Sequence, residues 1–111
     1  GGDRDQEKRS MMGAVAQSIA DHVIITSDNP RSEDPQDIMN MIVAGMSDHH
    51  TSSVELIADR AAAIMTAVRQ AQAHDVVLVA CKGHETTQEI QGKSFDFSDQ
   101  AHLRLVSGGA V

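Results

Sequence analysis

Aromatic side chains are nearly absent from this chain. Its 111 residues include two Phe, no Trp and no Tyr, so a core must be built from aliphatic side chains and six Met. Proteins that bind single-stranded nucleic acid stack the bases on aromatic rings, and this chain lacks such a platform. Its net charge of −7 would also repel a phosphate backbone. The composition argues against a nucleic-acid partner, and any anionic ligand must be held by a few local cations.

Cysteine, long apolar runs and targeting segments are also scarce or missing. The single Cys81 cannot form an intrachain disulfide, which is typical of a reducing compartment. No apolar stretch approaches the roughly 20 residues of a membrane-spanning helix, and Gly-Gly-Asp-Arg-Asp at 1–5 does not resemble a signal peptide. We therefore expect a cytoplasmic protein with no membrane partner. Because the chain starts without Met, we also expect it to be a fragment of a longer one.

Helical and extended apolar patterns alternate along the chain. Apolar residues recur with helical spacing over about 10–21, 34–47 and 59–71, and a last helix is expected from Ser98 to about 106. Strands are expected at 23–26, 54–58 and 76–80, the last apolar throughout and therefore central. A small hairpin follows, with its turn at Gly92-Lys93. The alternation predicts an α/β fold, a Rossmann-like three-layer sandwich with a mostly parallel sheet and a small C-terminal hairpin, as one domain over residues 1–111.

Polar and charged residues follow the strands expected at 23–26 and 76–80. Asp-Asn-Pro-Arg occupies 28–31 and Cys-Lys-Gly-His-Glu occupies 81–85. Ligands in open α/β sheets bind just beyond the carboxyl ends of the strands, so these two loops should meet at one edge. The charged segment 1–9 joins them there if a preceding strand has been cut away.

This edge would gather the cations Arg4 and Arg31, the anions Asp28 and Glu85, and the amide of Asn29. A guanidinium can grip a carboxylate with two parallel hydrogen bonds, and a carboxylate can hold an ammonium group. The set therefore suits a zwitterionic ligand such as the end of an amino acid. The alternatives are an ordinary turn with a solvated arginine and a group of solvated loop charges.

Other catalytic and ligand-binding patterns find no support. The chain contains neither a phosphate-binding Gly-x-x-x-x-Gly-Lys-Ser/Thr loop nor a dinucleotide-binding Gly-x-Gly-x-x-Gly turn. His49-His50 lacks a third metal ligand at a recognisable spacing. His84 could act as a general base, but a surface histidine is the simpler interpretation. We assign no catalytic residue and no metal ligand in this domain.

Four motifs occur in order along nearly the whole chain: Gly-Gly-Asp-Arg-Asp at 1–5, Asp-Asn-Pro-Arg at 28–31, Lys-Gly-His-Glu at 82–85 and Phe-Asp-Phe-Ser-Asp at 95–99. Together they resemble the carboxyl-terminal domain of the Mur ligases, and most narrowly the ligases that add meso-diaminopimelate in peptidoglycan synthesis. The resemblance implies the fold of that domain and a place in a longer, three-domain enzyme.

The resemblance also implies roles for residues at the sheet edge. Asp-Asn-Pro-Arg is the family's recognition motif for meso-diaminopimelate, which differs from lysine by a second carboxylate. Arg31 would bind that carboxylate together with Arg4, and Glu85 would hold the distal ammonium. The pocket would further be lined by Asp28, Asn29 and Pro30.

Two departures from the family pattern bear on this site. Relatives usually carry glycine at the position of Cys81, which would contribute through its backbone. If that position requires a positive φ, the cysteine side chain should narrow or distort the pocket. Segment 5–10 reads Asp-Gln-Glu-Lys-Arg-Ser where relatives commonly have Asp-Lys-Gly-Lys-Arg-Pro. In related ligases this loop approaches the nucleotide, which implies a weak nucleotide contact for Asp3 and Lys8.

The implied reaction is ATP-driven amide formation. The carboxylate of a UDP-N-acetylmuramoyl dipeptide is phosphorylated, and the amine of meso-diaminopimelate attacks the acyl phosphate. ATP and Mg²⁺ would be bound mainly by a central domain that this chain lacks, so we expect no cofactor on this domain alone and no turnover by it. Two alternatives stay open: a ligase of the same superfamily for lysine or another amino acid, and a non-catalytic small-molecule-binding α/β module.

Overall fold

The fold combines four helices with two small sheets in the part of the chain that the structure, a computed structural model, describes, residues 1–48 and 52–107. In chain order the elements are α1 (Glu7–Ile19), β1 (His22–Ile25), α2 (Pro35–Val43), β2 (Ser53–Leu56), α3 (Arg60–Gln70), β3 (Thr87–Ile90), β4 (Lys93–Asp96) and α4 (Asp99–Val106). Strands β1 and β2 pair in parallel, and β3 and β4 form an antiparallel hairpin. The predicted α/β class, with a parallel sheet and a C-terminal hairpin, is confirmed.

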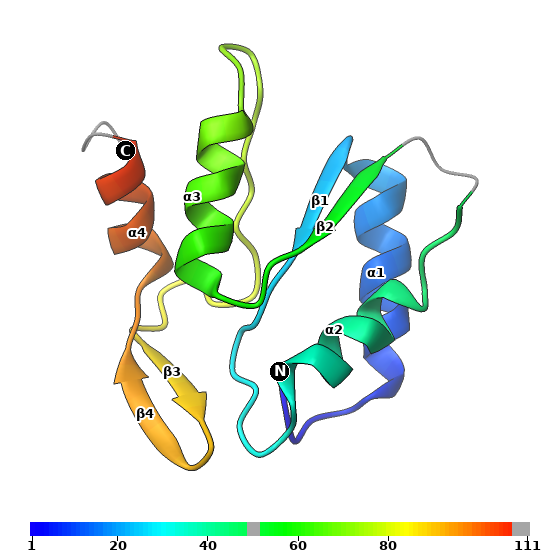
Figure 1. Cartoon of the computed structure of the whole chain (residues 1–111), viewed down its shortest axis with the longest axis vertical. Coiled ribbons are helices and arrows are strands. Elements are labelled where there is room, and N and C mark those ends of the chain that lie inside the picture. Colours follow the sequence, from blue (N-terminus) through cyan, green and yellow to red (C-terminus); the bar gives the residue numbers. More distant parts are fainter. Residues whose placement is uncertain (49–51, 108–111) are drawn as a thin grey trace.

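Helices cover both faces of the parallel pair (Figure 1). Strand β1 contacts α1 on one side and α3 on the other, while α2 packs on α1 and α4 packs on α3. The core of this sandwich contains Val23 and Ile25 of β1 and the fully buried Met39 of α2. Two glycines permit the close packing of α1 on α2: a Cβ at Gly13 would lie 2.0 Å from the Ile42 carbonyl oxygen, and one at Gly45 would lie 1.8 Å from that of Ser10.

The predicted helix starts at Asp34, Asp59 and Ser98 are confirmed. Each side chain accepts a hydrogen bond from a backbone N–H in the first turn of the helix that follows, which satisfies one of the donors that a helix start leaves free. Helix α1, in contrast, begins at Glu7, three residues ahead of the start expected at about residue 10. Helix α2 ends at Val43, ahead of the expected 47.

Residues 76–80 are not a central strand, which corrects the strongest strand prediction made from the sequence. The segment forms no ladder with β1 or β2, and Val76 and Leu78 are 93% and 85% exposed. A continuous apolar run predicts a strand only when neighbours cover both of its faces. In this structure β1 pairs with β2 instead.

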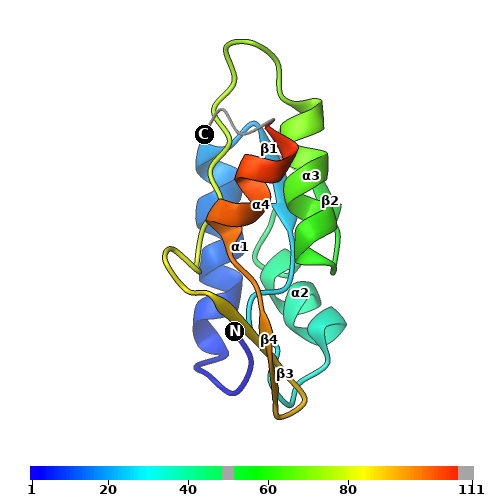
Figure 2. The same ribbon diagram turned by 90° about the vertical axis from the view of Figure 1, so that its left-hand side faces the viewer.

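The hairpin turn lies at Gln91-Gly92, one residue before the expected Gly92-Lys93. Both residues have a positive φ, 51° and 73°, as a two-residue turn between right-twisted antiparallel strands requires. The hairpin, the N-terminus and the segment after β1 lie at the same end of the molecule in both ribbon views (Figure 1 and Figure 2). This end therefore brings the predicted site segments together.

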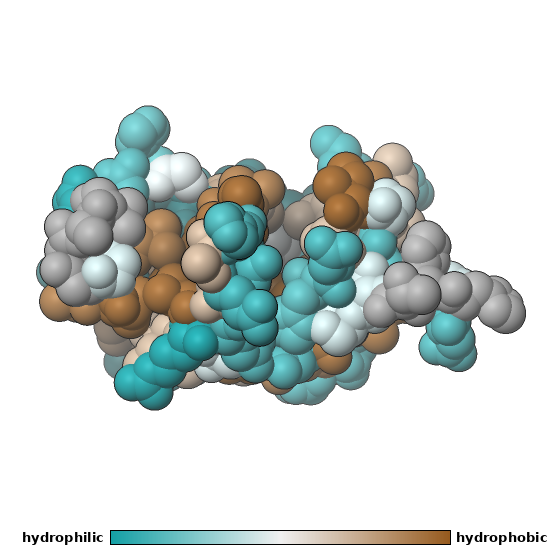
Figure 3. All heavy atoms as spheres, turned by 90° about the horizontal axis from the view of Figure 1, so that it is seen from above, coloured by the Kyte–Doolittle hydropathy of each residue, from teal (hydrophilic) through white to brown (hydrophobic). Residues whose placement is uncertain are grey.

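Apolar side chains also reach the surface. Ile19 of α1 and Leu105 of α4 are 80% and 77% exposed, and hydrophobic side chains show between polar ones in the end-on view (Figure 3). Within the described residues, no helix has both the length and the apolar character needed to cross a membrane.

Candidate functional site

The turn at 28–31 is held against the β3–β4 hairpin through the backbone of Arg31. Its N–H donates to the Glu89 carbonyl at 3.0 Å, and its own carbonyl accepts from the Gln91 N–H at 2.8 Å. Arg31 has a φ of 53°, a left-handed conformation that a side chain with a Cβ seldom adopts. The two hydrogen bonds to the hairpin therefore fix a turn that the local sequence would not hold by itself.

Hydrogen bonds hold the guanidinium of Arg31 at two of its three nitrogen atoms. Its Nε donates to Glu89 Oε2 at 3.0 Å, and its Nη1 donates to the Gly2 carbonyl at 2.8 Å. Among the residues the structure describes, Nη2 has no hydrogen-bond partner. The side chain borders a pocket of about 360 Å³ lined by Asp3, Arg31, Ser32, Glu89, Gly92, Lys93 and Ser94. An arginine held in this way can still grip an incoming carboxylate.

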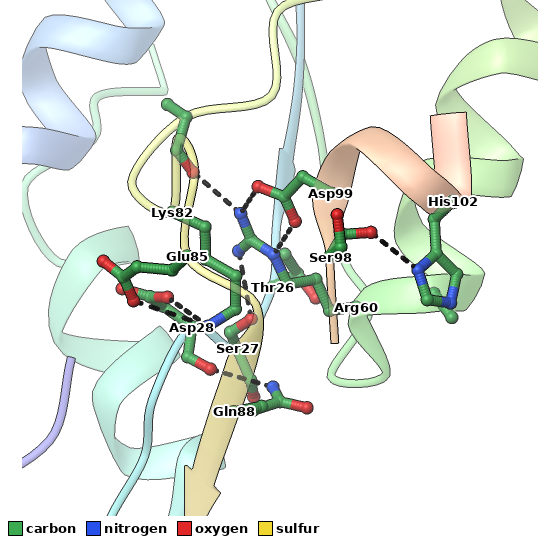
Figure 4. Close-up of polar contacts among 12 residues, drawn as sticks. Thr26, Ser27, Asp28, Arg60, Lys82, Glu85, Gln88, Ser98, Asp99 and His102 are labelled. Atoms are coloured by element: carbon green, nitrogen blue, oxygen red, sulfur yellow. Dashed lines mark hydrogen bonds and ion pairs between the residues drawn. The ribbon is translucent and has the colours of Figure 1, made fainter. Parts of the chain in front are cut away.

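Lys82 joins the two site loops from a fully buried position, and its ion pairs with Asp28 and Glu85 are drawn in Figure 4. Its Nζ donates to Asn29 Oδ1 at 3.1 Å and to the Thr87 carbonyl at 2.9 Å. The same ammonium lies 3.1 Å from Asp28 Oδ1, an ion pair without hydrogen-bond geometry, and 3.9 Å from Glu85 Oε1. Asp28 and Glu85, the two acidic residues predicted for the site, therefore both lie close to the Lys82 ammonium.

Asn29 connects the same loops with both ends of its side chain. Its Nδ2 donates to Glu85 Oε1 at 3.2 Å, while its Oδ1 accepts from Lys82 and from the Glu89 N–H. The structure thus confirms the prediction that loops 28–31 and 81–85 lie against each other. Sequence reasoning missed Lys82, although two carboxylates expected at one edge were a sign that an internal counter-ion was needed.

The remaining predicted residues lie around this centre. Arg4 and Lys8 are exposed, and neither side chain makes a hydrogen bond or ion pair with the described residues. A methyl group added at Gly1 would lie 3.1 Å from Arg31 Nη1 and 3.9 Å from Arg4 Cγ, so the two arginines flank the same short segment. Pro30 is buried. The exposed Cys81 has a φ of 90°, which confirms that this position requires the conformation that glycine adopts most easily.

Segment 1–9 is tied to the residues after the 28–31 turn by the buried Arg9. The guanidinium of Arg9 binds both carboxylate oxygens of Glu33, at 3.0 and 2.7 Å, and also donates to the Gly1 carbonyl. Asp3 adds a second tie, because its carboxylate accepts from the Ser32 hydroxyl at 2.6 Å. These contacts place segment 1–9 at the site edge, as expected.

The Arg9–Glu33 pair makes the free energy of unfolding depend on pH in the acidic range. The hydrogen bond from Arg9, followed by that from the Asp3 N–H, lowers the pKa of Glu33 from its ordinary 4.5 to about 2. A folded-state pKa below the unfolded one adds stability above pH 4.5 that is lost as the pH falls toward 2. We expect the Glu33→Gln variant to lose less stability than the parent over that range, as measured by urea unfolding at a series of pH values. Glu7→Gln, at an exposed glutamate, is the matched control, and equal slopes for the parent and Glu33→Gln would contradict the assignment.

No group of three or more His, Cys, Asp or Glu side chains is arranged to hold a metal ion within residues 1–48 and 52–107. His49-His50, the pair considered from the sequence, lies outside the described residues. His84 is exposed, and its ring hydrogen-bonds to the Gln100 amide at 3.2 Å.

Comparison with known proteins identifies close relatives. A family profile described as "Mur ligase, glutamate ligase domain" matches residues 1–83. The chain is 60% identical over 105 residues to the UDP-N-acetylmuramoyl-L-alanyl-D-glutamate–2,6-diaminopimelate ligase of Ralstonia nicotianae, covering 95% of this chain and 20% of that protein. The ligase of the same name from Acidovorax sp. is 55% identical, with coverage of 94% and 20%.

A solved structure of a ligase with this name superimposes with a TM-score of 0.89 at 43% identity, covering 97% of this chain and 22% of that one. This chain spans about a fifth of the length of the relatives it matches.

Proposed function

Because the chain belongs to the Mur ligase family, we propose that it is the amino-acid-binding carboxyl-terminal domain of a longer, three-domain ligase. In this proposal the whole enzyme adds meso-diaminopimelate to UDP-N-acetylmuramoyl-L-alanyl-D-glutamate, as the names of the relatives indicate. The domain binds the incoming amino acid and carries it to the reacting centre, so its contribution is proximity and orientation.

The observation that carries the proposal is the fixed guanidinium of Arg31. Glu89 and the Gly2 carbonyl hold it beside a pocket, while no described residue hydrogen-bonds to Nη2. Meso-diaminopimelate has a carboxylate on its distal carbon where lysine has hydrogen. Lysine would leave the guanidinium without that partner, and a site built to pair a polar group discriminates strongly against the analogue that lacks it.

The other predicted binding residues contact either the carboxylate or the ammonium group of the amino acid. Arg4 lies beside the same segment as Arg31 and shares the carboxylate. Glu85 binds the distal ammonium, since its side chain is 51% exposed and, within residues 1–48 and 52–107, Asn29 and Lys82 engage Oε1 alone. The wall of the pocket is completed by Asp28, Asn29, Pro30 and the backbone of Cys81.

The nucleotide chemistry belongs to the rest of the enzyme. ATP and Mg²⁺ bind mainly to a central domain, where the dipeptide carboxylate is phosphorylated, and Asp3 and Lys8 reach the nucleotide when the domains close. This domain alone has no turnover, and the enzyme works in the cytoplasm.

The proposal is tested with the purified full-length enzyme. We expect ATP-dependent amide formation from the UDP-N-acetylmuramoyl dipeptide with meso-diaminopimelate, and a value of kcat/KM for lysine lower by roughly four orders of magnitude. Phosphate release and product mass are the measurements. A preference for lysine would assign the domain to a lysine-adding ligase instead, and tight amino-acid binding without ATP consumption would assign it to a non-catalytic module.

A further inference from the structure

Arg60 and Asp99 form a buried ion pair between the starts of α3 and α4 (Figure 4). Nε and Nη2 of Arg60 donate to the two carboxylate oxygens of Asp99, each at 2.7 Å. Both side chains are nearly inaccessible, at 3% and 5% exposed. The pair joins the first residue of α3 to the first residue of α4, two helices that pack on each other.

Helix stability does not explain why a buried arginine stands at the start of α3. Asp99 at a helix start is favoured by the helix dipole, but a cation at the start of α3 is opposed by it. Burial by itself would lower the pKa of Arg60, and the hydrogen bonds and charge of Asp99 overcome this effect and raise it. A buried pair of this kind is often no more stabilising than apolar residues of the same size.

The other two hydrogen bonds of Arg60 supply that explanation. Nη1 donates to the Ser27 carbonyl at 3.1 Å, and Nη2 donates to the Ala80 carbonyl at 2.9 Å. Ser27 immediately precedes Asp28, and Ala80 immediately precedes Cys81. One rigid guanidinium therefore holds the chain at the entrance of both site loops.

We propose that Arg60, oriented by Asp99, is a positioning residue that sets the spacing between loops 28–31 and 81–85 and thereby the affinity for the amino acid. This inference rests on the proposed amino-acid-binding function. Arg60 acts through the backbone, because its hydrogen bonds to this part of the described chain go to the carbonyls of Ser27 and Ala80, directly before the two site loops. The segment 76–80 forms no sheet ladder, so the tie at Ala80 replaces hydrogen bonds that a strand would otherwise provide.

Two variants of the full-length ligase test the proposal. Arg60→Lys keeps the charge next to Asp99 but loses the planar fork that reaches both carbonyls. The double variant Arg60→Met/Asp99→Leu removes both charges together and so leaves no unpaired buried charge. In each, we expect KM for the amino acid to rise about tenfold, with KM for ATP within about twofold of the parent value.

Comparing the changes in KM and kcat distinguishes a role of Arg60 in positioning the loops from a role in folding. A variant that only folds less well contains less active enzyme, which lowers the apparent kcat and leaves KM unchanged. The matched controls are Arg69→Lys and Arg69→Met, at an exposed arginine in the last turn of α3. An unchanged KM for the amino acid in folded Arg60→Lys would overturn the proposal, and this variant decides alone if the double variant does not fold.

Failure of the inference is distinguishable from failure of the proposed function. KM is measured with whichever amino acid the unsubstituted enzyme prefers. A preference for lysine would therefore reject the proposed substrate and leave the test of Arg60 intact.

Discussion

Arg31→Ala is expected to remove most of the preference for meso-diaminopimelate over lysine in the full-length ligase. Loss of one partner from a desolvated, hydrogen-bonded charge pair costs roughly 2–5 kcal/mol. We therefore expect kcat/KM for meso-diaminopimelate to fall by about a hundredfold or more, while kcat/KM for lysine changes little. Competition between the two amino acids, followed by the masses of the products, measures the ratio directly.

The backbone does not confound this substitution. Alanine and arginine both carry a Cβ, so the cost of the left-handed conformation at position 31 is nearly the same in the two proteins. Arg69→Ala on the exposed end of α3 controls for the loss of one positive charge. Unchanged discrimination in Arg31→Ala would reject the role assigned to this guanidinium.

Lys82→Met is expected to lower the stability of the fold substantially. Methionine fills most of the volume of the lysine stem but leaves Asp28, Asn29 and the Thr87 carbonyl without the ammonium that they share. Breaking a buried ion pair costs up to 3–5 kcal/mol. Because Asp28 and Glu85 are partly exposed, solvent offsets part of this, and we expect the free energy of unfolding to fall by about 2–3 kcal/mol.

Urea unfolding of the domain measures this loss. Lys93→Met, at an exposed position in β4, is the control for removal of a charge and should change the free energy of unfolding by less than about 0.5 kcal/mol. Adding Asp28→Asn to Lys82→Met should recover part of the lost stability, since it removes the unpaired carboxylate. Equal stability of Lys82→Met and the parent would show that the buried ammonium has no net role in holding the two loops together.

The parts of the fold set by local chemistry were predictable from the sequence. Asp34, Asp59 and Ser98 cap their helices because each offers a side-chain oxygen directly before a helical pattern. The site edge was predictable for a similar reason, since the carboxyl ends of strands and their polar loops are local features that topology brings together.

Features set by long-range partners were not predictable. The run 76–80 has the composition of a buried strand, yet whether it pairs depends on which segment β1 selects, and β1 pairs with β2. The first turn of α1 contains Arg9, which is anchored by Glu33, a partner far along the chain. Lys82 looked like one charge in a polar loop, because nothing in Lys-Gly-His-Glu reveals that its ammonium is enclosed by Asn29 and Thr87.

The two-residue turn of the hairpin has a consequence for selectivity. Gln91-Gly92 fixes the pairing of Glu89 with Ser94, and Glu89 is the residue whose carboxylate and backbone both hold Arg31. Side chains alternate between the two faces of a strand, so a slip of one residue would turn that carboxylate away from the guanidinium. A single insertion in this exposed turn, which itself borders the pocket at Gly92, would therefore displace the carboxylate that orients the guanidinium proposed to select the amino acid.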